Sequence, residues 1–439
     1  MYKQILFFYG IVLILGCLVG AIGSGFQFFI TLLSNGLTTV YHVANLHDLP
    51  VGFIAAIVSM LLVFVTWMIV RRFAPEAAGS GVPEIEGALL HERPIHWAHL
   101  LPVKFIGGIL SISANMVLGR EGPTIQIGGN LGAMLSARFR IPKHRRETLI
   151  LAGAAAGLAT AFNAPLAGVL FVIEEMRHAF NYSFTNFSMV AICCVSATII
   201  QHLMIGSQPA ILMSVFETPS LHSLVWFFLF GIVVGFAGLL FNLALMRSLG
   251  QTDRFSLKQR IVFVLMVGAL IGYLGYVYPD VVGGGYQIIE QSLSMRPSFT
   301  LLLILIVVRF FTTMLCYTTG VPGGIFAPML ALGTLLGLAC SYILQWSVDP
   351  SLHPGMFAVA GMGALFAAAV RAPLTGIVLV VEMTQNYSLI LPLMVTCLTS
   401  TTVVQLWGNQ PIYTQLLFRL MKHPLPRKLN RDRQGVDGR

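Results

Sequence analysis

Three short motifs rich in glycine and proline each open an apolar segment: GSGVPEIEG at 79–87, GREGP at 119–123 and GGIFAP at 323–328. Glycine and proline end one helix and start the next, because proline suits the first helical turn and glycine lets the backbone approach closely. The first turn presents unpaired N–H groups and the positive end of the helix dipole. If the three starts converge, their amides can bind an anion without a buried lysine or arginine, and loosely enough for release. The alternative is that they are ordinary starts of broken helices.

Glu121 lies inside the second motif, in the first turn of an apolar helix. The helix dipole and amide hydrogen bonds stabilise a carboxylate there, so Glu121 can occupy the anion site itself. When protonated it loses that attraction and can swing away, and an anion can take its place. These residue types predict a site in which proton and anion occupancy are linked. The alternative is that Glu121 pairs with Arg120.

The segments that carry these motifs are too apolar for a soluble protein. Hydrophobic residues make up 56% of the 439 positions and charged residues only 10%, against about 25% charged residues in a soluble domain. Several apolar stretches exceed the ~20 residues that cross a bilayer, and the last has room for two or three passes. They lie at roughly 5–34, 51–70, 99–118, 148–175, 187–206, 223–246, 260–278, 299–318, 325–347 and 356–407. The sequence therefore predicts an all-α polytopic membrane protein surrounded by lipid.

The net charge of +9 does not indicate nucleic-acid binding, because the basic residues cluster between apolar spans. The positive-inside rule assigns such clusters to the cytoplasm, which places the 138–146 loop and the C-terminus there. We expect the N-terminus on the same side. All six cysteines lie in apolar runs without metal-ligand spacing, so we interpret them as small hydrophobic residues. No metal or cofactor site is predicted.

The chain repeats itself at a long period. The segment NAPLAGVLFVIEEM at 163–176 aligns with RAPLTGIVLVVEM at 371–383, which places Glu174 on Glu382. GREGPTIQIGGNLG aligns in the same way with GIFAPMLALGTLLG, and Lys104 with Arg309. We predict a first repeat at 1–210, a second at 211–421 and a short basic tail at 422–439. Such a plan is typical of secondary transporters, whose site lies near the bilayer midplane between broken helices of two repeats. The alignment alone does not distinguish parallel from inverted repeats, and inverted topology is the expectation.

The ordered set GSGVPEIEG, GREGP, GGIFAP and PIYTQLL, with Tyr413 in the last, resembles the signature of the CLC family of chloride channels and chloride/proton exchangers. The likeness runs over about residues 5–420 and is strongest to bacterial exchangers at 119–176. It implies that chloride is contacted by the hydroxyls of Ser80 and Tyr413 and by the amides of Ile325 and Phe326. It also makes Glu121 the external gate for anions and protons.

The resemblance further implies that Glu175, in VIEEM, transfers protons on the cytoplasmic side. Adjacent helix positions point ~100° apart, so Glu175 can face a proton path while Glu174 faces packing. The alternative is that both cap this helix near the surface. Six other charged residues are expected to form internal ion pairs or cap helix ends, with Glu86 and Lys104 also candidates to tune the field in the proton path: Glu84, Glu86, Lys104, Arg309, Arg371 and Glu382.

The resemblance leads us to expect a chloride/proton exchanger, not an enzyme, that forms a homodimer with one pathway per subunit in a bacterial inner membrane. Fewer than 30 residues follow Tyr413, so no nucleotide-sensing regulatory domain is expected. The runner-up is a passive chloride channel, in which Glu175 would be idle. Serine at position 80 resembles chloride-selective members more than nitrate-selective ones. A remote alternative is an intramembrane serine protease, because AGSG at 78–81 resembles a nucleophile turn, but such an enzyme needs a histidine beside Ser80.

Overall fold

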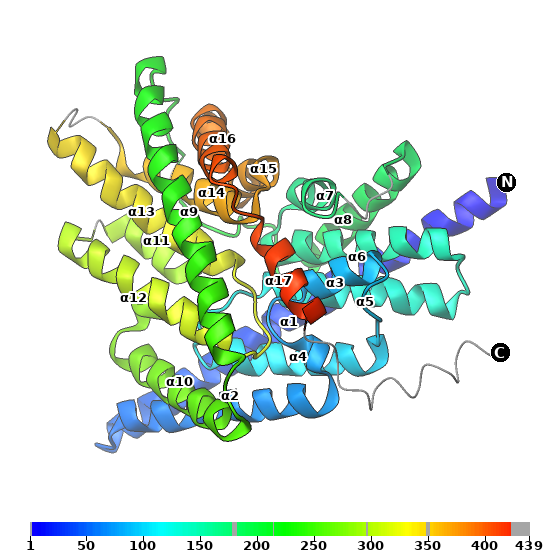
Figure 1. Cartoon of the computed structure of the whole chain (residues 1–439), viewed down its shortest axis with the longest axis horizontal. Coiled ribbons are helices and arrows are strands. Elements are labelled where there is room, and N and C mark those ends of the chain that lie inside the picture. Colours follow the sequence, from blue (N-terminus) through cyan, green and yellow to red (C-terminus); the bar gives the residue numbers. More distant parts are fainter. Residues whose placement is uncertain (1, 178–181, 214, 296, 348–351, 423–439) are drawn as a thin grey trace.

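The computed structural model describes residues 2–177, 182–213, 215–295, 297–347 and 352–422, and within these ranges it is helical without a strand (Figure 1). The predicted basic tail lies outside the described residues from position 423 onward. The described α-helices, in chain order, are α1 (Tyr2–Leu46), α2 (Val51–Phe73), α3 (Val82–Leu89), α4 (Trp97–Ser113), α5 (Glu121–Arg138), α6 (Lys143–Phe162), α7 (Pro165–Glu174), α8 (Phe184–Met204), α9 (Leu224–Thr252), α10 (Leu257–Val277), α11 (Tyr286–Met295), α12 (Phe299–Thr318), α13 (Phe326–Ser347), α14 (Pro354–Val370), α15 (Pro373–Thr384), α16 (Ile390–Leu406) and α17 (Ile412–Lys422).

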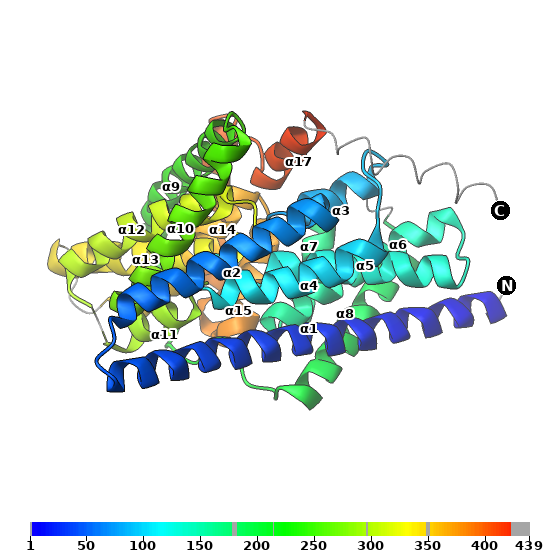
Figure 2. The same cartoon turned by 90° about the horizontal axis from the view of Figure 1, so that it is seen from below.

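Eight described helices are long and apolar enough to cross a membrane: α1, α2, α8, α9, α10, α12, α13 and α16. The chain is therefore a multi-pass membrane protein, as predicted. The stretch at 356–407, expected to make two or three passes, contains three helices, α14 to α16, of which only α16 with the turn before it is a candidate span. Helix α1 is longer than the predicted stretch at 5–34 and runs along the length of the molecule in the lower part of Figure 2, where α8 crosses it.

The helices of the two halves pack in corresponding pairs. Helix α5 packs against α6 as α13 packs against α14, and α6 packs against α8 as α14 packs against α16. Helix α1 likewise contacts α8, and α9 contacts α16. The order of helices is thus the same in both halves, whereas the exact boundary between residues 210 and 211 stays a prediction.

Two equivalent glutamates show that corresponding helices run in opposite directions. Glu174 ends α7 and accepts hydrogen bonds from the backbone N–H groups of Leu374 (2.9 Å) and Thr375 (2.6 Å), in the first turn of α15. Glu382, near the end of α15, accepts from Leu166 (3.1 Å) and Ala167 (2.8 Å) in the first turn of α7. Each helix therefore ends where the other begins. Antiparallel equivalent helices are what inverted repeats require.

Candidate anion site

The three glycine- and proline-rich motifs meet through backbone hydrogen bonds. Gly119 and Gly324 each donate their N–H to the other's carbonyl oxygen at 2.7 Å. Gly79 donates to Val321 at 3.2 Å, and Gly323 donates back to Gly79 at 3.1 Å. These short bridges bring together the starts of α3, α5 and α13, which confirms that the three helix starts converge.

Glycine is needed at this junction because the backbones and side chains approach so closely. A Cβ atom on Gly119 would lie 1.9 Å from Oε2 of Glu121, and one on Gly122 would lie 2.6 Å from Oγ of Ser80. Real Cβ atoms do not tolerate such distances, so any larger residue would push the carboxylate or the serine away. The motif glycines therefore let Ser80 and Glu121 lie against the start of α5.

The predicted anion-binding residues come together at this junction. Ser80, Ile325, Phe326 and Tyr413 are all buried, with at most 1% of their surface exposed. The ring of Tyr413, on α17, stacks on Phe326 at a centroid distance of 5.8 Å. Oγ of Ser80 and Oη of Tyr413 are buried and have no hydrogen-bond partner of good geometry among the described residues. Buried hydroxyls are normally satisfied, so two unpaired donors beside helix starts fit an anion as their acceptor.

Glu121 is fully buried and begins α5. Its Oε1 accepts a hydrogen bond from Oη of Tyr286 at 2.5 Å, while Oε2 has no partner of good geometry in the described part of the chain. The backbone N–H groups of Glu121 and Ala327 face the carboxylate. Arg120 makes no hydrogen-bonded ion pair with Glu121 and instead lies over the ring of Tyr286, 4.7 Å from its centroid. The carboxylate thus occupies the place where the starts of α5 and α13 meet.

Sequence reasoning missed Tyr286, although a signal for it was present. The turn GGGY at 283–286 aligns with GSGV at 79–82 in nearly the same register that relates Lys104 to Arg309. Because the second turn lacks serine and proline, it did not stand out as a fourth motif.

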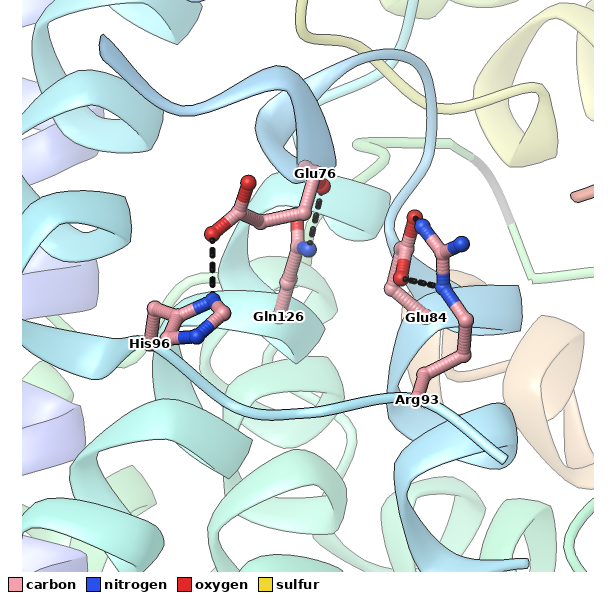
Figure 3. Close-up of polar contacts among 5 residues, drawn as sticks. All are labelled: Glu76, Glu84, Arg93, His96 and Gln126. Atoms are coloured by element: carbon pink, nitrogen blue, oxygen red, sulfur yellow. Dashed lines mark hydrogen bonds and ion pairs between the residues drawn. The ribbon is translucent and has the colours of Figure 1, made fainter. Parts of the chain in front are cut away.

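Polar contacts join the segment before the GSGV turn to α5, and α3 to the segment that follows it (Figure 3). Nε2 of Gln126, on α5, donates to the carbonyl oxygen of Glu76 at 2.8 Å, and the carboxylate of Glu76 lies 3.3 Å from Nδ1 of His96. Arg93 donates to both carboxylate oxygens of Glu84 at 2.9 and 2.5 Å. The residues around Ser80 are therefore tied to neighbouring segments on two sides.

Five of the six other charged residues make structural contacts, although only Glu84 and Glu382 make the predicted ion pair or helix cap. Glu84 pairs with Arg93, and Glu382 caps α7. Nζ of Lys104 donates to the carbonyl oxygens of Ala77 (2.9 Å) and Gly79 (2.7 Å). Arg309 donates in the same way to three carbonyls, and Arg371 to that of Asn409 at 3.4 Å. Glu86 is the exception, because it makes no ion pair and its buried Oε2 has no partner among the described residues.

The adjacent glutamates at the end of α7 face different surroundings, as predicted. Glu174 caps α15, whereas Glu175 is buried and close enough to Glu86 to interact electrostatically. Tyr413 also lies within electrostatic range of Glu175. The idea that both glutamates cap their own helix at the surface is wrong, because Glu174 caps a different helix and Glu175 points into the protein. Two carboxyl groups, Glu86 and Glu175, therefore lie near the Tyr413 end of the site.

A cavity of about 350 Å³ reaches Ser80. Its lining includes Gly79, Ser80 and Tyr317 at one end, and Asp253, Arg260 and Arg419 elsewhere. Arg419 donates to both oxygens of Asp253 at 2.7 and 2.5 Å, and Arg260 lies 3.7 Å from the same carboxylate. Glu84 also lines this cavity, so two arginines face two carboxyl groups and the formal charges of the lining balance.

No histidine contacts Ser80 within the described ranges, because its Oγ has no hydrogen-bond partner. His96 instead approaches Glu76, and His202 approaches Asn163. The serine therefore lacks the base that a protease needs.

Comparisons with known proteins agree with this geometry. Residues 62–405 match the model of the voltage gated chloride channel family. The chain belongs to the voltage-gated chloride channel (CLC) family. A Vibrio cholerae CLC protein named H(+)/Cl(-) exchange transporter ClcA is 46% identical over 416 residues, covering 94% of this chain and 89% of the relative. A protein of the same name from Salmonella paratyphi A is 45% identical over 415 residues, covering 93% and 87%.

A solved structure shows the same CLC fold. The crystal structure of a slow cyanobacterial Cl-/H+ antiporter superposes with a TM-score of 0.90 at 37% identity, covering 95% of this chain and 98% of the other. The named relatives are transporters, and the family resemblance predicted from the motifs is confirmed.

Proposed function

We propose that this CLC protein is a secondary active transporter that exchanges chloride for protons. One observation carries the proposal: the Glu121 carboxylate lies where the starts of α5 and α13 meet, near two buried hydroxyls that lack partners. A site of this kind attracts an anion and already holds a titratable one. The names of the bacterial relatives and of the cyanobacterial antiporter support the same activity.

Exchange follows from competition between two anions for the converging helix starts. The ionised Glu121 carboxylate closes the pathway because it takes the place that chloride would occupy. Protonation removes its charge and its attraction to the helix dipoles, so the side chain leaves and chloride enters. Chloride is then held by the hydroxyls of Ser80 and Tyr413 and the amides of Ile325 and Phe326. One protonation thus accompanies each opening of the anion pathway.

The proton reaches Glu121 from the other side of the membrane by way of Glu175. The burial of Glu175, and its nearness to Glu86 and Tyr413, support this role. The chloride and proton routes therefore share Glu121 and diverge toward Ser80 and Glu175. No resident metal or cofactor and no covalent chemistry enter this mechanism.

The test is transport by purified protein in sealed liposomes that hold a chloride gradient, with the voltage clamped by potassium and valinomycin. A pH electrode outside records the protons. Protons driven uphill by the chloride gradient are the expected result. Chloride flux without proton movement would identify a passive channel and leave Glu175 idle, and the absence of chloride flux would overturn both assignments.

We further propose that the protein is a homodimer with one pathway per subunit, in a bacterial inner membrane with both termini in the cytoplasm. The bacterial relatives and the basic clusters support this placement. Light scattering of the detergent-solubilised protein should give twice the mass of the 47.8 kDa chain after subtraction of the detergent. Labelling of single cysteines placed at each terminus with an impermeant reagent tests the orientation.

A further inference from the structure

Tyr286 is the side chain that holds Glu121. Its hydroxyl donates to Oε1 of Glu121 at 2.5 Å, and its ring lies under the guanidinium of Arg120 at 4.7 Å. The backbone N–H groups of Glu121 and Ala327 also face the carboxylate, and Gly119 leaves room for its Oε2. The phenol is therefore the one described side chain that makes a hydrogen bond to the gate.

The backbone before Tyr286 is fixed by two glycines with positive φ and by hydrogen bonds from Arg309. Gly283 and Gly285 have φ angles of +72° and +106°, which favour glycine, and a Cβ on Gly285 would lie 2.5 Å from Cβ of Ala331 on α13. The fully buried Arg309 donates to the carbonyl oxygens of Asp280 (2.7 Å), Val282 (2.9 Å) and Gly283 (2.9 Å). This turn leads into α11 and fixes the position of the Tyr286 backbone, from which the side chain extends to Glu121.

We propose that Tyr286 is a positioning residue of the gate, whose hydroxyl holds the ionised Glu121 carboxylate at the converging helix starts. Arg120 holds the ring in place through its cation–π contact. The proposal rests on the proposed function, because it gives Glu121 the role of a gate. Nothing in the CLC motifs points to this residue, which lies on α11 of the second half.

The hydrogen bond slows the opening of the gate. A phenol donates more strongly to a carboxylate than to a neutral carboxylic acid, so the contact favours the ionised, closed gate over the protonated, open one. The other groups that face Glu121 are Arg120 from its own helix start, Tyr413 from α17 and the N–H of Ala327 from α13. All of these remain in a variant that loses only the hydroxyl.

The substitution Tyr286→Phe removes the hydroxyl and keeps the ring under Arg120. Chloride and proton fluxes are measured in liposomes for four proteins: the unaltered chain, Tyr286→Phe, Glu121→Ala and the double variant. Tyr286→Phe should exchange about tenfold faster at neutral pH. The pH at which its rate is half-maximal should move up by about one unit, because the gate protonates more readily. In the Glu121→Ala background, the same substitution should leave chloride flux unchanged.

Equal effects of Tyr286→Phe in both backgrounds would overturn the proposal, since a general structural role does not depend on the gate carboxylate. An unchanged rate and pH profile in the otherwise unaltered chain would also overturn it. The control is Tyr273→Phe, the same chemical change at an exposed phenol on α10, which should match the unaltered chain. Failure of the proposed function is seen separately, as uncoupled flux in the unaltered chain.

A second variant covers the case in which Tyr286→Phe is not monodisperse by size-exclusion chromatography. Arg120→Gln leaves the phenol in place but removes the cation above its ring. It should raise the exchange rate by at least about threefold, because the gate loses both the cation–π contact that holds the ring and the positive charge that faces Glu121. Persistence of this increase in the Glu121→Ala background would contradict the proposal.

Discussion

The turns GSGV at 79–82 and GGGY at 283–286 have a similar backbone conformation and differ in their side chains. The glycines at the first and third positions have positive φ in both turns, +62° and +85° in GSGV and +72° and +106° in GGGY. A buried cation holds each turn by its carbonyl oxygens, Lys104 in the first half and Arg309 in the second. The second and fourth positions, by contrast, are Ser80 and Val82 in one turn and Gly284 and Tyr286 in the other.

The difference shows how one duplicated turn can have a different function in each half of the protein. Positive φ restricts the first and third positions to glycine, because a Cβ is strained there. The other two positions keep ordinary backbone angles and can vary. In the first turn the second position supplies the hydroxyl of Ser80 to the anion site. In the second turn the fourth position supplies the hydroxyl of Tyr286 to the gate.

The largest expected effect comes from removing the charge that lies between the two turns. Glu121→Gln keeps the shape of the gate but cannot bind or release a proton. Proton flux in the liposome assay should fall by about 10³-fold, in line with the loss of an acid–base group, while chloride still moves. Continued uphill proton pumping would remove Glu121 from the gate, and with it the task assigned to the second turn.

A somewhat smaller effect is expected at the neighbouring glutamates of α7. Glu175→Gln should lower proton flux by about 10²-fold without stopping chloride, because it interrupts the proton path. Glu174→Gln is the matched control, since this residue caps α15. It should preserve coupling and lower only the thermal midpoint of the detergent-solubilised protein. A loss of coupling in both variants would show that the two residues do not have separate roles.

The cations that hold the turns can be compared directly. Lys104→Met leaves the carbonyl oxygen of Ala77 without its donor and that of Gly79 with only the N–H of Gly323, and Arg309→Met removes the side-chain donor of three carbonyl oxygens. Each substitution should cost about 3 kcal/mol of stability. Arg309→Met should be the more destabilising, because Arg309 serves three carbonyls and Lys104 two. Thermal unfolding followed by size-exclusion chromatography measures the order. The reverse order would mean that the two turns are not held in equivalent ways.

The smallest expected effect is on anion affinity. Ser80→Ala removes one hydroxyl donor and should weaken chloride binding by about fivefold to tenfold, measured by calorimetry on the purified protein. Gly284→Ser places a hydroxyl at the equivalent position of the other turn, where a Cβ would meet its nearest neighbour at 3.2 Å. The substitution should not change affinity, because that turn does not face the predicted chloride site. Equal affinities of Ser80→Ala and the unaltered chain would remove Ser80 from the site.

The sequence by itself determined the membrane environment, the fold class and which helix starts converge. Apolar runs longer than a bilayer require helices in lipid, because no other open structure satisfies its backbone there. Glycine and proline in register marked the helix starts that converge, and the repeated GVLFVIEEM and GIVLVVEM segments marked the two halves. These features could be read locally, since helix breaking and membrane crossing depend on neighbouring residues.

Only the tertiary structure decided which partners meet across the chain. The hydrogen bond from Tyr286 to Glu121 joins residues 165 positions apart. The reciprocal caps made by Glu174 and Glu382 join residues 200 to 216 positions apart, and they established the antiparallel arrangement that the sequence left open. Contacts of this kind depend on how the helices pack, and packing is a property of many residues at once. The role of the tyrosine that follows three glycines therefore depends on the folding that brings it beside Glu121.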